Sequence, residues 1–156
     1  CNGHPTMKQY GIKTYCEKII IMTPGQHCPM HFHWSKTEDI INRGGGRLVC
    51  QLYNATPDDR LADDPVRVCV DGRQLEVAAG TEIELAPGES ITLPPRLYHA
   101  FWGAPGGGTV LIGEVSTVND DTRDNRFLEE LPRYPGIEED EPPLRLLCHE
   151  YPPGYY

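Results

Sequence analysis

Two histidines one residue apart, His31 and His33, are the residues whose type and spacing predict chemistry most directly. In a β-strand alternate side chains share a face, so both imidazoles point the same way, with Cα atoms about 7 Å apart. Glu38 follows after a connection short enough to return the next strand beside the first, and His99 lies near the start of a later strand. A single strand histidine is more often a core or surface residue, but three imidazoles and one carboxylate together form a ligand set for a divalent transition metal.

The elements that must position these residues are short strands joined by tight turns. The chain has 16 glycines and 15 prolines among 156 residues, which excludes a long helical bundle because helix interiors tolerate neither residue well. Apolar runs bounded by turn residues predict an all-β antiparallel sandwich or small barrel in a single domain, 1–156. The expected strands are 17–23, 30–34, 38–42, 47–54, 66–70, 73–77, 82–85, 90–93, 97–102, 109–117 and 144–150.

Two further segments have their own expected form. Asp71 and Gly72 lie between two of these strands and are the strongest hairpin signal of the chain. The polar stretch 119–130 is expected to hold one or two helical turns, and 132–143 is expected to be a loop.

Charge and cysteine content narrow the class of partner. The net charge is −9, with 14 basic and 23 acidic side chains, which argues against nucleic acid and anionic membranes because both require a basic surface. The sequence contains no apolar run of 18 residues, so no membrane span is expected. No signal peptide is recognised at the start, Cys1. The six cysteines are scattered, and Cys50 and Cys69 lie in apolar runs. We therefore expect buried thiols and a cytoplasmic protein.

The spacing of the ligand residues closely resembles the two signature motifs of the cupin superfamily. The resemblance rests on the patterns Gly25-x5-His31-x-His33-x4-Glu38-x6-Gly45 and Gly88-x5-Pro94-x4-His99. It departs from them where Arg96 replaces the usual glycine and Gly103 the usual asparagine. The resemblance implies a double-stranded β-helix, or jelly-roll barrel, with short helical or loop extensions. It also implies that His31, His33, Glu38 and His99 bind the metal inside it.

A narrower resemblance covers nearly all of the chain from Met7 onward. The stretches 31–46, 93–102, 113–121 and 137–151 are similar to the D-lyxose isomerase family of cupins. That resemblance implies a manganese-dependent homodimer that converts D-lyxose to D-xylulose and D-mannose to D-fructose through a cis-enediol. Zn²⁺, Fe²⁺, Co²⁺ and Ni²⁺ suit the same ligands. Longer members carry an N-terminal segment that this chain is expected to lack.

Four other residues are candidates for work on a sugar. Glu114 interrupts an apolar strand and would be the proton-transferring base if it faces the barrel interior, but a solvated carboxylate if it faces outward. Lys36, two residues before Glu38, would steady a sugar oxygen or be an ordinary turn lysine. Trp34 would line a sugar pocket or belong to the core. Glu139 would reach the site only if the acidic tail folds back over the barrel.

Two other functions use the same ligands. One is an Fe(II)-dependent cupin dioxygenase, which would consume oxygen with its substrate. The other is a non-catalytic cupin that binds sugar and moves no proton.

Overall fold

The structure is a computed structural model that describes residues 14–131, 138 and 140–146. These residues contain strands and turns and no helix. Their strands are β1 (Tyr15–Met22), β2 (His27–His33), β3 (Glu38–Gly45), β4 (Leu48–Asn54), β5 (Val66–Val70), β6 (Arg73–Val77), β7 (Glu82–Leu85), β8 (Ser90–Leu93), β9 (Leu97–Gly103), β10 (Val110–Thr117) and β11 (Asn125–Phe127).

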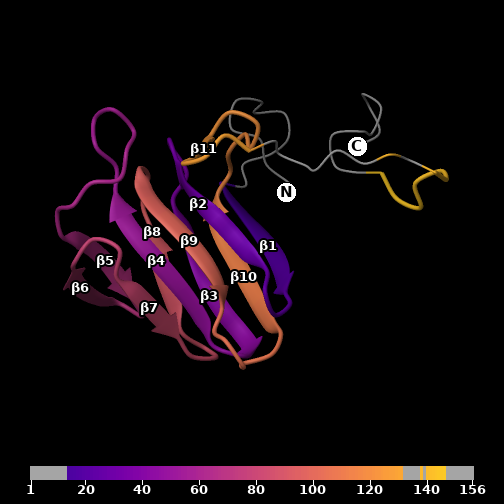
Figure 1. Cartoon of the computed structure of the whole chain (residues 1–156), viewed down its shortest axis with the longest axis horizontal. Helices are drawn as coiled ribbons and strands as arrows, with labels where there is room; N and C mark the ends of the chain where they lie inside the picture. The colour runs from indigo at the N-terminus through magenta and orange to yellow at the C-terminus, as the bar shows by residue number, and fades with distance from the viewer. Residues whose placement is uncertain (1–13, 132–137, 139, 147–156) are drawn as a thin grey trace.

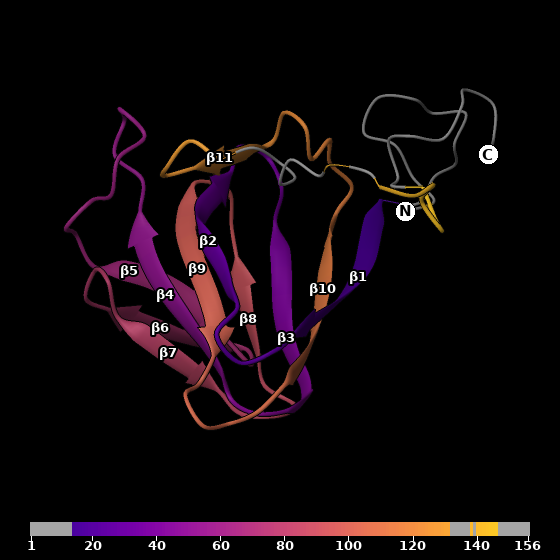
Figure 2. The same ribbon diagram turned by 45° about the vertical axis from the view of Figure 1, so that its right-hand side comes forward.

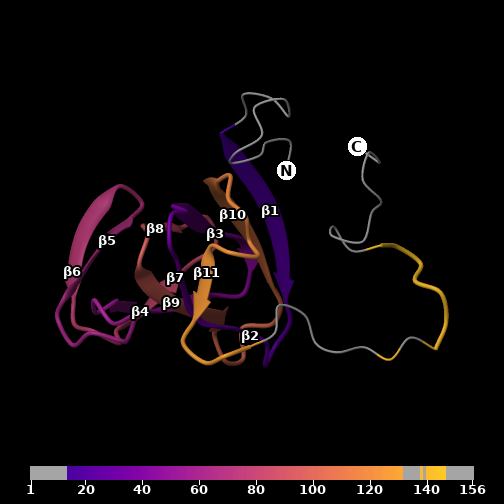
Figure 3. The ribbon, with the colours of Figure 1, turned by 90° about the horizontal axis from the view of Figure 1, so that it is seen from above.

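The strands form two antiparallel sheets that face each other. One has the order β1-β10-β3-β8-β5-β6 and the other β11-β2-β9-β4-β7. The two layers overlap in Figure 1 and come apart in the turned view of Figure 2, and Figure 3 shows them from above, around a common interior. Apart from the β5–β6 hairpin, sequential strands alternate between the sheets, so residues far apart in the chain become neighbours. This arrangement confirms the expected all-β jelly roll.

Turn chemistry explains why the predicted strands were close to the observed ones. Asp71 and Gly72, with φ of 47° and 75°, connect β5 and β6 in a two-residue hairpin. Positive φ at both central residues is what a type I′ turn requires, and its twist matches that of the strands. The hairpin predicted from this pair is confirmed.

Two predictions about the C-terminal half were wrong. The stretch 119–130 holds a turn and the short strand β11 in place of helical turns, because β11 pairs with β2 and so acquires its hydrogen bonds from a neighbouring strand. Residues 144–146 of the predicted strand 144–150 are not in a strand, and the rest of that range lies outside the described residues.

Apolar side chains from both sheets fill the interior between the layers. Strand alternation places them there, as in β10, where Val110 and Ile112 are fully buried while Leu111 between them is 40% exposed. The buried cluster consists of Met22, Ile40, Leu48, Cys50, Leu52, Val66, Val68, Val70, Leu85, Ile91, Leu93, Leu97, Phe101, Val110 and Ile112. Cys50 is a buried free thiol and Cys69 a half-buried one, whereas Cys16 is disulfide-bonded.

The turn from β3 to β4 needs glycine at one position for two reasons. Gly45 has a φ of 86°, and a Cβ built on it would lie 2.1 Å from the carbonyl oxygen of Thr109. The following amide, of Gly46, donates to that same oxygen at 3.1 Å. The close approach therefore belongs to the hydrogen bonding that joins this turn to the start of β10.

We predict that Gly45→Ala destabilises the fold far more than Gly25→Ala. Gly25 has the same positive φ, 85°, but a Cβ there has no neighbour within 4 Å. The free energy of unfolding of the Gly25 variant should fall only by the cost of a left-handed alanine, about 1–2 kcal/mol, and that of the Gly45 variant should fall clearly more. Urea unfolding midpoints measure the difference. Equal losses would contradict the steric role of Gly45.

Candidate metal centre and active site

Four buried side chains from three strands converge at one end of the barrel. His31 and His33 end β2, Glu38 begins β3 and His99 lies near the start of β9, where it is the direct cross-strand partner of His31. Their exposed fractions are only 1–6%, and their ligand atoms all lie within 4.8 Å of one another. The strand directions explain the convergence, because the end of β2 and the starts of β3 and β9 lie at the same end of the barrel. The structure thus brings all four predicted ligands together.

The Nδ1 atom of each imidazole faces an oxygen acceptor outside the cluster. His31 Nδ1 is 2.7 Å from the carbonyl oxygen of Pro29, and His99 Nδ1 is 2.9 Å from that of Leu97. His33 Nδ1 lies 2.8 Å from the side-chain Oδ1 of Asn125. Donation of Nδ1–H to these oxygens leaves the Nε2 lone pairs for the cluster, which is how metal-binding histidines are usually oriented.

The Nε2 atoms meet the carboxylate of Glu38. Glu38 Oε1 lies 3.1 Å from His33 Nε2 and 3.0 Å from His99 Nε2. His99 Nε2 is nevertheless a buried atom without a hydrogen-bond partner, because the contact does not have hydrogen-bond geometry. Burial, together with His99 and His33, holds the pKa of His31 well below its usual range, so its ring is neutral near pH 7. Three imidazoles and a carboxylate whose donor atoms converge fit a divalent transition metal.

Lys36 is a buried ammonium between two carboxylates. It is 3% exposed, and its Nζ lies 2.6 Å from Glu38 Oε2 and 3.0 Å from Glu114 Oε1. Burial alone would lower the pKa of Lys36, but the two carboxylates outweigh it and raise that pKa. For Glu38, an acid, burial alone would raise the pKa. Its contacts with His33, His99 and Lys36 outweigh burial and hold that pKa well below its usual range. At neutral pH both groups are charged, and the lysine is not an ordinary turn residue.

Glu114 faces the barrel interior, which decides between the two orientations left open by the sequence. On β10 it follows Ile112 on the inward face and is only 7% exposed. Lys18, its cross-strand partner on β1, contacts the same Oε1 atom at 2.9 Å that Lys36 contacts. Among the described residues, Oε2 of Glu114 has no hydrogen-bond or ion-pair partner, so this oxygen is free to exchange a proton.

Asp124 holds the connection that carries Lys36. Its buried carboxylate accepts hydrogen bonds from the amide of Ser35 at 2.8 Å, from the hydroxyl of Ser35 at 2.7 Å and from the amide of Lys36 at 3.1 Å. Its own carbonyl oxygen accepts from the amide of Trp34 at 3.0 Å. The backbone of 34–36 is thereby fixed in the position from which Lys36 reaches the two glutamates.

Three residues of the ligand cluster, His31, His33 and Glu38, line one cavity of about 220 Å³ together with Lys36 and Glu114. Lys18 and Asp121, 3.5 Å apart, also line it, as does Phe127, whose ring stacks on that of His31. Cys28 forms part of the wall, and burial raises its pKa to about 12, so it is a neutral thiol at physiological pH. The cavity combines metal ligands, a buried cation and a carboxylate in one place, which suits proton transfer on a polar small molecule.

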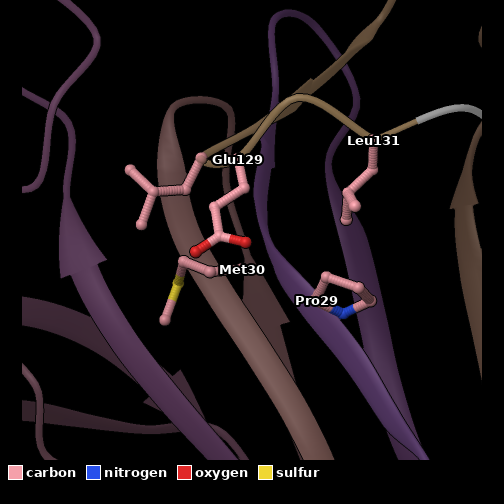
Figure 4. A pocket seen from close by; sticks show the side chains of 5 residues that line it. Pro29, Met30, Glu129 and Leu131 are labelled. Carbon is pink, nitrogen blue, oxygen red and sulfur yellow. The ribbon is translucent and has the colours of Figure 1, made fainter.

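A second hollow of about 210 Å³ lies beside β2 and contains none of these groups. Figure 4 shows its lining, in which the carboxylate of Glu129 approaches the side chain of Met30. The other lining residues are Pro29, Leu128 and Leu131. Its apolar walls carry one titratable group and no cluster suited to chemistry.

Of the two predicted sugar contacts, Trp34 is not brought to the cavity. Trp34 is 43% exposed, packs edge-on against Phe32 and lies under the guanidinium of Arg96, 5.3 Å from its ring centre. Strand alternation explains this, because Trp34 follows the inward-facing His33 and so projects the other way. The structure therefore does not support Trp34 as a lining residue. Glu139 lies outside the described residues.

Arg96, at the position where the cupin motif usually has glycine, has a backbone conformation that favours glycine. Its φ of 62° is the left-handed conformation that glycine adopts most easily. Its guanidinium donates to the carbonyl of Thr56 at 2.9 Å and to Asp59 Oδ1 at 2.8 Å, and lies over the rings of Phe32 and Trp34. These contacts offset the cost of the conformation.

Three residues of the site were not predicted from the sequence. Asp124 and Asn125 fall in the stretch expected to be helical, so no strand register was assigned to them. Lys18 did leave a signal, because it lies on the same face of β1 as Cys16 and Ile20. A charge at an inward position of an apolar strand indicates a functional or paired group.

The search for a membrane span gave a negative result for the described part of the chain. It contains no helix long and apolar enough to cross a membrane.

Comparison with known proteins identifies close relatives. Residues 1–151 match the model of a family described as D-lyxose isomerase. A D-lyxose/D-mannose isomerase of Serratia proteamaculans is 58% identical over 150 residues, covering 96% of this chain and 65% of the relative. One of Escherichia coli O157:H7 is 54% identical over 140 residues, covering 90% of this chain and 62% of the relative. The chain thus spans slightly less than two thirds of the length of both relatives.

A solved structure supports the fold. The ligand-free L-ribose isomerase of Cellulomonas parahominis superimposes with a TM-score of 0.54 and 22% identity, covering 75% of this chain and 59% of that one. This likeness confirms the expected cupin architecture of the barrel.

We predict that His31→Ala and Glu38→Ala each weaken Mn²⁺ binding at least about 100-fold, since loss of an outer hydrogen-bond partner alone typically weakens metal binding about 10- to 100-fold. Elemental analysis after dialysis measures the bound metal. His27→Ala is the matched control, because His27 lies on the same strand outside the cluster, with its ring against Trp102. Full metal content in either ligand variant would contradict the assignment.

Proposed function

Since the chain belongs to the D-lyxose isomerase family, we propose that it is a metal-dependent isomerase that converts D-lyxose to D-xylulose and D-mannose to D-fructose. The names of the two close relatives support the choice of sugars. The observation that carries the chemistry is the buried bridge in which Lys36 contacts both Glu38 of the ligand cluster and Glu114. It places a free carboxylate oxygen in the same cavity as the metal ligands.

The proposed metal ligands are His31, His33, Glu38 and His99, with Mn²⁺ as the expected ion. When bound, a divalent cation supplies Lewis-acid stabilisation of the negative charge that develops on the sugar oxygens at C1 and C2. Burial of the four ligands restricts water around this charge, which strengthens every electrostatic interaction there.

Glu114 is the proposed base. In the aldose-to-ketose direction its Oε2 takes the proton from C2, and the electron pair of that C–H bond forms the C1–C2 double bond of the cis-enediol. The π pair of the C1 carbonyl moves to O1, which takes a proton from a water molecule. The same carboxyl then returns a proton to C1, while the C2 hydroxyl gives its proton back to water and the C2 carbonyl forms. The contacts of Lys18 and Lys36 with Oε1 hold the carboxylate in one orientation through both steps.

Lys36 is the proposed electrostatic partner. Its ammonium is buried beside both glutamates, so it is positioned to donate a hydrogen bond to a sugar oxygen whose charge increases during enolisation. Because Asp124 fixes its backbone, little reorganisation is needed when the sugar enters. The two glutamates keep the ammonium charged at the pH of the reaction.

We predict that Glu114→Gln lowers kcat by about 10²- to 10⁴-fold, the usual contribution of a general base, while metal content is unchanged. The amide keeps the shape and an oxygen for the lysines but cannot take a proton. Lyxose-to-xylulose turnover and elemental analysis provide the two measurements. Glu84→Gln is the control, because Glu84 is a strand glutamate whose side chain is 56% exposed. Full activity in Glu114→Gln would place the base elsewhere.

We predict that incubation with D-lyxose in deuterated water gives D-xylulose labelled at C1, because the carboxyl of Glu114 exchanges its proton with solvent. NMR of the recovered sugars measures the label. Unchanged, unlabelled lyxose despite saturable binding would indicate a binding module. Substrate-dependent oxygen consumption after reconstitution with Fe²⁺ would indicate a dioxygenase.

A further inference from the structure

The three imidazoles of the cluster are not held in the same way. His31 and His99 each face the carbonyl oxygen of the residue two positions earlier in their own strands, Pro29 and Leu97. His33 faces the amide oxygen of Asn125, which is 92 residues away on β11. The first two contacts belong to the backbone of the ligand strands. The third depends on a single side chain.

Asn125 is placed opposite His33 by strand pairing. β11 pairs with β2 in the register Asn125↔His33 and Phe127↔His31. Figure 2 shows β11 across the end of the barrel, next to β2. The amide side chain lines the same cavity as the cluster, and its Oδ1 lies 2.8 Å from His33 Nδ1.

The neighbours of Asn125 fasten this short strand on both sides. Asp124 accepts hydrogen bonds from the backbone of Ser35 and Lys36, and Phe127 stacks on His31 with ring centres 5.2 Å apart. These contacts fix the backbone of β11, and with it the place from which the Asn125 side chain reaches His33. A fixed acceptor at Nδ1 is what selects one tautomer and one ring orientation.

The choice of an amide suits the charge of the site. An amide oxygen accepts the Nδ1 proton but adds no negative charge to a cavity that already contains Glu38, Glu114 and Asp121. It therefore orients His33 through a hydrogen bond alone.

We propose that Asn125 is a positioning residue of the metal centre, which sets metal affinity by holding His33 in the Nδ1–H tautomer with Nε2 facing Glu38. This inference rests on the metal centre of the proposed function. Its consequence is that the segment 124–127 controls the affinity for metal although it supplies none of the proposed ligands.

The test compares Asn125→Leu, which keeps the size but removes the acceptor, with Asn125→Asp, which keeps an oxygen at the same place. Each purified full chain is stripped of metal and titrated with Mn²⁺ against a competing chelator. We expect the Leu variant to bind about 10- to 100-fold more weakly and the Asp variant to recover most of the affinity. Asn54→Ala is the matched control, because the side chain of Asn54 contacts Asp64 and Pro65, away from the metal centre.

A second readout does not involve the metal. Long-range ¹H–¹⁵N NMR of the stripped protein reports the tautomer of His33. The Nδ1–H fraction should fall in Asn125→Leu, because the acceptor that remains beside the ring is Glu38 Oε1, 3.1 Å from Nε2. If the Leu variant does not fold, Asn125→Ala takes its place, since it removes the acceptor without adding bulk. Unchanged affinity and an unchanged tautomer would overturn the inference. A wild-type chain that binds no Mn²⁺ would instead overturn the proposed function.

Discussion

One buried ammonium governs the arrangement of this site. An isolated charge inside a protein costs several kcal/mol, so Lys36 can lie in the barrel only with compensating partners. Glu38 and Glu114 provide them at 2.6 and 3.0 Å. Because one oxygen of Glu38 pairs with this lysine and the other faces two histidines, a single carboxylate connects the ligand cluster with the side of the cavity that carries the proposed base.

The fold meets this constraint by bringing distant segments to one end of the barrel. Lys36 comes from the connection after β2, Glu38 from β3 and Glu114 from β10, and the last two strands are hydrogen-bonded neighbours. The backbone amides of Ser35 and Lys36 in this connection donate to the carboxylate of Asp124, which lies 88 residues after Lys36 in the sequence. The geometry of the site therefore depends on contacts between residues that are far apart in the sequence and close together in the fold.

Strand alternation made much of this predictable. The period of two placed His31 and His33 on one face, and turn residues marked the boundaries of most strands. The same rule, applied one residue further, would have shown that Trp34 projects away from the cavity. The stretch 119–130 could not be assigned correctly, because its polar residues form β11 only by pairing with β2. The polar side chains of Asp124 and Asn125 bind partners about 90 residues earlier in the chain, which the local sequence does not reveal.

The sequence by itself determined the ligand types, their spacing and the short strands and turns that carry them, because these depend on local backbone geometry and on the chemistry of each side chain. The family resemblance rested on the same local patterns. Only the tertiary structure decided that Glu114 faces inward, that Lys18 and Lys36 share its Oε1, and that Asn125 holds His33. Those features arise because strands far apart in the sequence pair within each sheet and the two sheets enclose one interior, which brings together side chains 78 to 96 residues apart.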